Sequence, residues 1–181
     1  MVHISMGVTD YRQWDYVSYI FIDILVTALY LLRSKTVAFS KSLSEHGVAL
    51  VSTFYIYAFD YDVGLKSEFS IYGNLLLLIG TYLSIMSLLS LGKSFGILPV
   101  LRHVKTQKMY KHIRHPLYAS YILMDLGIVI GYFSFYNLLI FVLGIVLFLA
   151  RIRYEEKVLR QNEEYQRYAI RTPYRLFPKI Y

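Results

Sequence analysis

The sequence of 181 residues contains no cysteine, which excludes disulfide bonds, thiolate nucleophiles and cysteine-ligated metals. Charged residues are also scarce: they make up 17% of the chain, against about 25% in an average soluble domain. No glycine-rich dinucleotide turn, Walker loop or GxSxG nucleophile elbow occurs, so no Rossmann-type site is expected. His103, His112 and His115 lack the spacing of metal ligands, and we expect no metal site.

Long apolar runs take the place of these features, and 56% of the residues are hydrophobic. They predict an all-α integral membrane protein with about five transmembrane helices in one membrane domain, residues 1–181. Residues 16–91 hold three spans, and 92–181 hold a basic connector, a helical hairpin and a charged helical tail. The predicted spans are 16–32, 48–59 (extended by flanking residues such as Leu43), 69–91, 117–135 and 138–150.

The ends of the last two spans give further expectations. Only Tyr136 and Asn137 separate these spans, which predicts a tight hairpin. The fifth helix meets no breaker and should continue to about Gln161. Turns are expected near Pro173 and Pro178.

The basic residues predict the orientation. Three follow the first span, six follow the third, and eight lie from Arg151 onward, which is 17 of the 19 lysines and arginines. The positive-inside rule therefore places the C-terminus in the cytoplasm and the N-terminus outside. Residues 1–15 lack a basic region, so no cleaved signal peptide is expected. The net charge of +7 indicates contact with anionic lipid headgroups, and no nucleic-acid partner is expected.

The stretch Ile113–Tyr118 ends the basic connector and begins the fourth apolar run. Proline fits the first turn of a helix and keeps the residue before it out of helical geometry. His115 should therefore lie at the mouth of a membrane helix, with Tyr118 one turn inside. The free N–H groups of this turn favour a carboxylate or a phosphate. A membrane helix with interfacial anchors is an equally simple interpretation.

Two pairs of polar residues share helical faces. Arg151 and Glu155 are four residues apart where the fifth run meets charged sequence, and an ordinary surface ion pair would explain them as well. Glu156 should point elsewhere and form such a surface pair. Asp125 and Asp23 lie deep in predicted spans, where a carboxylate is by default a functional candidate. Either one could instead be protonated, or bonded to a tyrosine of a neighbouring helix.

Taken together, several motifs resemble the isoprenylcysteine carboxyl methyltransferase family, chiefly its short prokaryotic members. The resemblance covers about residues 88–181, and the motifs are Leu91–Gly96, Tyr110, Arg114–Tyr118, Arg151 with Glu155, Glu156 and Leu159, Tyr165, Tyr168 and Arg175–Pro178. It implies an integral membrane enzyme that transfers a methyl group from S-adenosylmethionine to a carboxylate of a lipid-like or prenylated acceptor. The family often has glycine where this chain has Ser120, which affects helix packing rather than chemistry.

The resemblance also implies site residues on the cytoplasmic side of the membrane. Arg151 would face the acceptor. The cofactor pocket would be lined by Arg102, His103, Val104, Lys105, Tyr110, His115, Pro116, Leu117, Tyr118 and Glu155. A carboxylate is already ionised at neutral pH, so the reaction needs alignment and exclusion of water rather than a strong base.

Other functions share some of these features. Phospholipid or amine N-methyltransferases have the same helical arrangement and cofactor, and sterol reductases with a similar C-terminal half use NADPH. A small transporter or a non-catalytic scaffold would use Asp23 and Asp125, but the polar groups gather at one membrane face instead of the midplane. The acceptor and the oligomeric state cannot be read from the sequence.

Overall fold

The computed structural model describes residues 11–40, 42–61, 65–66, 69–179 and 181. Residues 1–10, on which most of the signal-peptide expectation rests, lie outside this set. Lys41, Asp62 and Glu68 of the predicted loops lie outside it as well. The described chain is mostly helical, as predicted. Its α-helices are α1 (Tyr11–Leu31), α2 (Leu43–Phe54), α3 (Ser70–Leu91), α4 (Pro116–Gly131), α5 (Phe135–Leu159) and α6 (Glu163–Arg171).

Short elements connect the helices. Single 3₁₀ turns are η1 (Tyr55–Ala58), η2 (Gly92–Ser94) and η3 (Lys108–Lys111). Two antiparallel ladders of two residues each pair β1 (Ala38–Phe39) with β3 (Val100–Leu101) and β2 (Leu65–Lys66) with β4 (Tyr132–Phe133). Each ladder joins loops that are far apart in the sequence, so the ladders fasten the two ends of the bundle.

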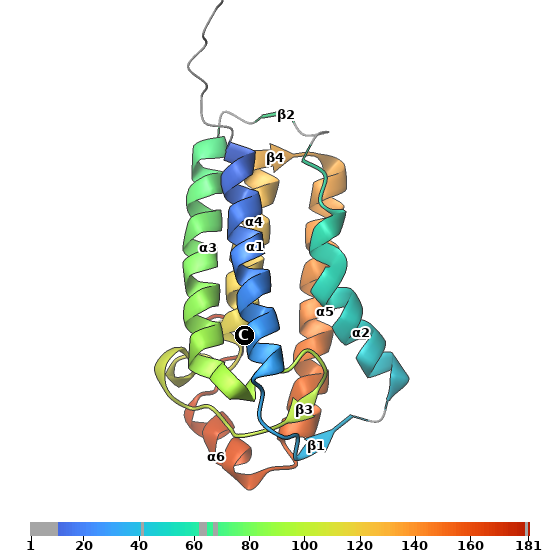
Figure 1. Cartoon of the computed structure of the whole chain (residues 1–181), viewed down its shortest axis with the longest axis vertical. Helices are drawn as coiled ribbons and strands as arrows, with labels where there is room; N and C mark the ends of the chain where they lie inside the picture. Colours follow the sequence, from blue (N-terminus) through green and yellow to red (C-terminus); the bar gives the residue numbers. More distant parts are fainter. Residues whose placement is uncertain (1–10, 41, 62–64, 67–68, 180) are drawn as a thin grey trace, which may run out of the picture.

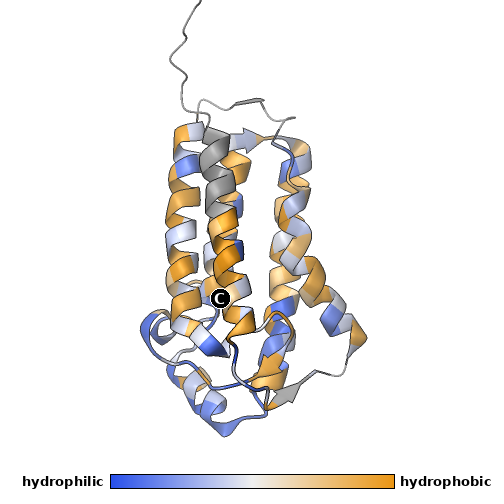
Figure 2. Ribbon diagram, viewed as in Figure 1, coloured by the Kyte–Doolittle hydropathy of each residue, from blue (hydrophilic) through white to orange (hydrophobic). Residues whose placement is uncertain are grey.

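α1, α3, α4 and α5 run along one axis, and α2 is inclined to it, with α6 and the β1–β3 ladder at one end and the β2–β4 ladder at the other (Figure 1). Two segments, Ser70–Ser94 and Phe135–Leu159, are long and apolar enough to cross a membrane. Ile20–Leu31 and Pro116–Gly131 are shorter apolar helices. Most residues of the bundle helices are hydrophobic, and hydrophilic ones gather at the end that carries α6 (Figure 2). Five crossings remain a prediction.

The helices form two groups. α1 packs on α3, which packs along its length on α4, while α2 packs on α5 (Figure 1). The α3–α4 contact is very close: a Cβ atom at Gly80 would lie 2.9 Å from the carbonyl oxygen of Ser120. Ser120 lies at this contact, and its hydroxyl donates to the Leu117 carbonyl. The absence of a side chain at Gly80 therefore provides the space on the facing helix.

The predicted position of the α4–α5 turn is wrong. α4 ends at Gly131 and α5 begins at Phe135, so the connection is 132–134, and Tyr136 and Asn137 lie within α5. Ser134 caps α5 by accepting from the Asn137 backbone N–H. The fully buried Asn137 side chain bonds both backbone groups of Asp60 and the carbonyl of Tyr132. The polar asparagine therefore joins two loops and does not form the turn.

Candidate functional site

A cavity lies between the two groups of helices and opens toward the α6 end. Of the eleven residues predicted for the site, ten line this cavity: Arg102, His103, Val104, Lys105, Tyr110, His115, Leu117, Tyr118, Arg151 and Glu155. Pro116 does not line it. Pro116 is instead the first residue of α4, as predicted, with His115 as the residue before the helix. Pro116 therefore sets the start of α4, and so the positions of His115 before the helix and of Tyr118 in its first turn.

Glu155 is the carboxylate around which this wall is organised. The Tyr118 hydroxyl donates to it, and Arg151 Nε donates to Glu155 Oε1 at 3.1 Å. His115 Nδ1 lies 3.8 Å from Glu155 Oε2, and the rings of His115 and Tyr118 stack with centroids 5.8 Å apart. Glu155 is only partly buried, so its carboxylate retains access to the cavity.

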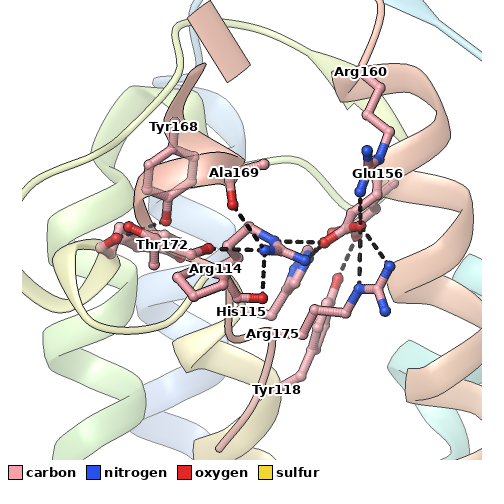
Figure 3. A network of polar contacts seen from close by, with 12 residues as sticks. Arg114, His115, Tyr118, Glu156, Arg160, Tyr168, Ala169, Thr172 and Arg175 are labelled. Carbon is pink, nitrogen blue, oxygen red and sulfur yellow. Dashed lines mark hydrogen bonds and ion pairs between the residues drawn. The ribbon is translucent and has the colours of Figure 1, made fainter. Parts of the chain in front are cut away.

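Glu156 is buried, and the expectation that it forms a surface ion pair is wrong. Its Oε1 accepts from Arg114 Nε at 2.8 Å, and its Oε2 accepts from Arg175 Nη2 at 3.0 Å (Figure 3). His115 Nε2 lies 3.4 Å from Oε1, and Arg160 approaches Oε2 from the protein surface. The hydrogen bonds to Glu156 raise the pKa of Arg175.

This network attaches the C-terminal tail to the start of α4. Arg114 Nη1 donates to the carbonyl oxygens of Thr172 and Pro173 at 2.8 and 2.7 Å (Figure 3). The backbone N–H of His115 donates to the Arg175 carbonyl at 2.8 Å. His115 is therefore held between Glu155 and Glu156 by its backbone as well as by its ring.

Among the described residues, two buried polar groups of the cavity have no hydrogen-bond partner. Arg102 donates through Nε to the Ser34 carbonyl at 2.9 Å and through Nη2 to Thr36 at 3.2 Å, but its buried Nη1 has no partner. Burial lowers the pKa of Arg102, because desolvation disfavours the cation. The Tyr165 hydroxyl is likewise buried without a partner. Both residues line the cavity, so both are available to a ligand.

The remaining connector residues form the polar mouth. Burial raises the pKa of Tyr110, so its hydroxyl stays neutral, and the Tyr168 hydroxyl donates to the Tyr110 carbonyl at 2.6 Å. His103 is exposed, whereas Val104 and Lys105 are partly buried beside it. These residues therefore lie where a ligand would meet solvent.

Arg151 is buried and holds several elements together. Its Nη1 donates to the Ala49 carbonyl and to the hydroxyls of Ser52 and Thr53 on α2, and its Nη2 donates to the Ile97 carbonyl at 2.6 Å. A guanidinium has five N–H groups, so these bonds and the one to Glu155 leave one N–H of Nη2 without a partner among the described residues.

Both aspartates singled out in the sequence also line the cavity. Asp125 is 2% exposed and accepts a hydrogen bond from the Tyr55 hydroxyl. Asp23 is exposed on α1 and accepts from the Tyr57 hydroxyl at 2.7 Å. Each aspartate therefore accepts a hydrogen bond from a tyrosine of a neighbouring segment, which was one of the alternatives that the sequence left open.

Sequence reasoning did not select Arg114, Glu156 and Tyr165 as site residues, although all three belong to the motifs quoted above. The adjacent pairs Arg114–His115 and Glu155–Glu156 were a usable signal, because Arg114, His115 and Glu155 line the cavity and Glu156 pairs with Arg114 behind it. No such signal separates Tyr165 from the other 18 tyrosines.

Comparison with known proteins agrees with this arrangement. No curated protein matches the chain. A family model matches residues 74–161, from the first turns of α3 to just beyond the end of α5, and covers His115, Tyr118, Arg151, Glu155 and Glu156. By this match the chain belongs to the isoprenylcysteine carboxyl methyltransferase (ICMT) family, whose members are membrane-bound methyltransferases.

Proposed function

We propose that the protein is a multi-pass membrane methyltransferase that uses S-adenosylmethionine and methylates a carboxylate of a lipid-like or prenylated acceptor. Its site would face the cytoplasm. The observation that carries this proposal is that two unpartnered buried donors, Arg102 Nη1 and the Tyr165 hydroxyl, lie in one cavity with Glu155. Most of this cavity lies in the part of the chain that matches the methyltransferase family.

The donor set fits the proposed cofactor. S-adenosylmethionine carries a carboxylate, an ammonium group, ribose hydroxyls and a purine. Arg102 would bind the carboxylate through its free N–H, because a buried guanidinium without an acidic partner favours an anion. Glu155 would accept from the ammonium or the ribose hydroxyls, and the Tyr165 hydroxyl would bond a polar atom of the same ligand.

The cavity wall supplies alignment rather than acid–base chemistry. When bound, S-adenosylmethionine supplies a methyl group on a positively charged sulfur. The free N–H of Arg151 would orient the acceptor carboxylate, and an ionised carboxylate needs no general base. Tyr118 stacks on Phe148 with ring centroids 5.4 Å apart, so this part of the wall is apolar and excludes water from the reacting groups.

Calorimetry on the purified full-length protein tests the cofactor. We expect saturable binding of S-adenosylhomocysteine and none of NADPH. His115→Ala and Glu155→Ala should each weaken binding by about 1–3 kcal/mol, because each removes a buried or partly buried polar partner. Arg153→Gln, which alters an exposed arginine on the same helix, is the matched control. Binding of NADPH, or unchanged affinity in both alanine variants, would refute the proposal.

A further inference from the structure

The cavity has a second polar end, separate from the one assigned to the cofactor. Asp125 and Tyr121 of α4 and Tyr55 of η1 line it. Asp125 lies seven residues after Tyr118 on α4, which is about 10 Å further along the helix axis. Apolar residues, including Met124 and Phe148, also line the cavity.

Asp125 is underused as a hydrogen-bond acceptor. A carboxylate offers about four acceptor positions, and in the described part of the chain Asp125 accepts only from the Tyr55 hydroxyl. No lysine, arginine or histidine of the described residues forms an ion pair with it. The Tyr121 hydroxyl, on the same wall, makes no hydrogen bond within the described residues either. A buried carboxylate with so few partners is unfavourable unless it is protonated or a ligand supplies further hydrogen bonds.

Asp23 differs from Asp125 although both line the cavity. Asp23 is exposed at the side of the bundle, and its partner Tyr57 is 67% exposed. Asp23 therefore meets surroundings outside the cavity, whereas Asp125 meets only the cavity and its walls. This difference makes Asp23 a matched comparison for Asp125.

We propose that Asp125, with Tyr121 beside it, forms an acceptor subsite for a hydrogen-bond-donating group, an amine in preference to a hydroxyl. A purely hydrocarbon tail would cover Asp125 without bonding it. An acceptor with a donor group about 10 Å from its reacting end would complete the carboxylate's bonds. The role of the reacting end rests on the proposed function, but the subsite itself does not.

Binding of matched ligands tests the subsite. The full-length protein in detergent is titrated calorimetrically with 8-aminooctanoic, 8-hydroxyoctanoic and octanoic acid, each with and without S-adenosylhomocysteine. Asp125→Asn should weaken 8-aminooctanoate about tenfold, the loss expected for a charged hydrogen-bond partner, and change octanoate by less than about twofold. Each ligand is compared between proteins, so its partition into detergent cancels.

Two further variants separate recognition from a structural role. Tyr55→Phe removes the tyrosine hydroxyl but keeps the carboxylate, so 8-aminooctanoate should bind at least as tightly as it does to the wild type. A structural role predicts that Asp125→Asn and Tyr55→Phe weaken all three ligands alike, and that result would overturn the proposal. An effect of Asp23→Asn on 8-aminooctanoate that Asp125→Asn lacks would also overturn it. If S-adenosylhomocysteine does not bind, the proposed function fails, and the titrations without it still decide the subsite.

Discussion

At the scale of single residues, the two adjacent glutamates of α5 have different surroundings and different consequences. Glu155 faces the cavity and keeps a partly open carboxylate. Glu156 points into the protein, where Arg114 and Arg175 bond it. Successive residues of a helix point about 100° apart, so one helix end contributes to both the cavity and its support. The support positions His115, because that ring lies between the two carboxylates.

Removing the charge of Glu156 should destabilise the protein. Glu156→Gln leaves the buried Arg114 without its counter-charge, and breaking a buried pair in this way costs about 3–5 kcal/mol. The free energy of unfolding in detergent, or the shift in Tm, measures the effect. Arg160→Gln is the control, since Arg160 is 54% exposed and its pair with Glu156 should contribute less than about 1 kcal/mol. Equal losses in the two variants would contradict the buried network.

Arg151 should matter for turnover more than for cofactor affinity. Arg151→Lys can keep one bond to Glu155 but cannot also reach α2 and the Ile97 carbonyl. We expect methyl transfer to fall about a hundredfold, because small misalignments of reacting groups have effects of that size. Affinity for S-adenosylhomocysteine should stay near the wild-type value. Full turnover in Arg151→Lys, or loss of cofactor binding in Arg151→Ala, would show that Arg151 does not act on the acceptor.

At the scale of elements, the close contact of α3 and α4 fixes one wall of the cavity. A Cβ atom at Gly127 would lie 2.6 Å from the Gly73 carbonyl oxygen and 2.8 Å from the Leu77 nitrogen. Both atoms belong to the backbone, so they cannot move aside as a flexible side chain would. α4 carries Tyr118 and Asp125, and its position therefore depends on small residues at this contact.

Gly127→Ala should destabilise the bundle by about 1–3 kcal/mol through overpacking. Gly47 on α2 is the control: a Cβ atom there meets nothing within 4 Å. Gly47→Ala should stabilise the protein by about 0.5–1 kcal/mol, because alanine loses less entropy than glycine in a helix. Thermal unfolding of both variants in the same detergent measures the difference. A Gly127→Ala protein as stable as the wild type would mean that the two helices can separate without loss.

Elements that depend on local pattern were predictable from the sequence, and those that depend on distant partners were not. Apolar runs located the five long helices, and Pro116 located the start of α4. The turn at Asn137 was misplaced because the partners of that side chain belong in part to Asp60, 77 residues away. The burial of Glu156 escaped prediction for the same reason, since Arg114 is 42 residues distant. The family resemblance supplied the site list, and composition alone indicated only which membrane face carries it.

At the scale of the whole molecule, the charge distribution and the arrangement of elements agree. The connector, η3 and α6 lie at one end of the bundle, and the β2–β4 ladder lies at the other (Figure 1). The end with the connector and α6 carries most of the basic residues and the mouth of the cavity. Under the proposed function, a water-soluble cofactor would enter from this basic end, which the positive-inside rule places in the cytoplasm. A lipid-like acceptor would enter from the side of the bundle, between the apolar helices.

Cysteine labelling in sealed vesicles tests this orientation, and the absence of native cysteine gives it no background. Single cysteines at Lys66 in β2 and Lys108 in η3 should react with a membrane-impermeant maleimide from opposite sides, because the single predicted span α3 separates these two positions. A cysteine at Arg171, at the end of α6, should label from the same side as Lys108. Labelling of Lys66 and Lys108 from one side would rule out five crossings. If Lys66 and Lys108 label from opposite sides but Arg171 also labels opposite to Lys108, an odd number of crossings must separate Lys108 from Arg171. The α4–α5 hairpin would then not return to the same side, and α6 could not line the cavity through Tyr165 as it does in this structure.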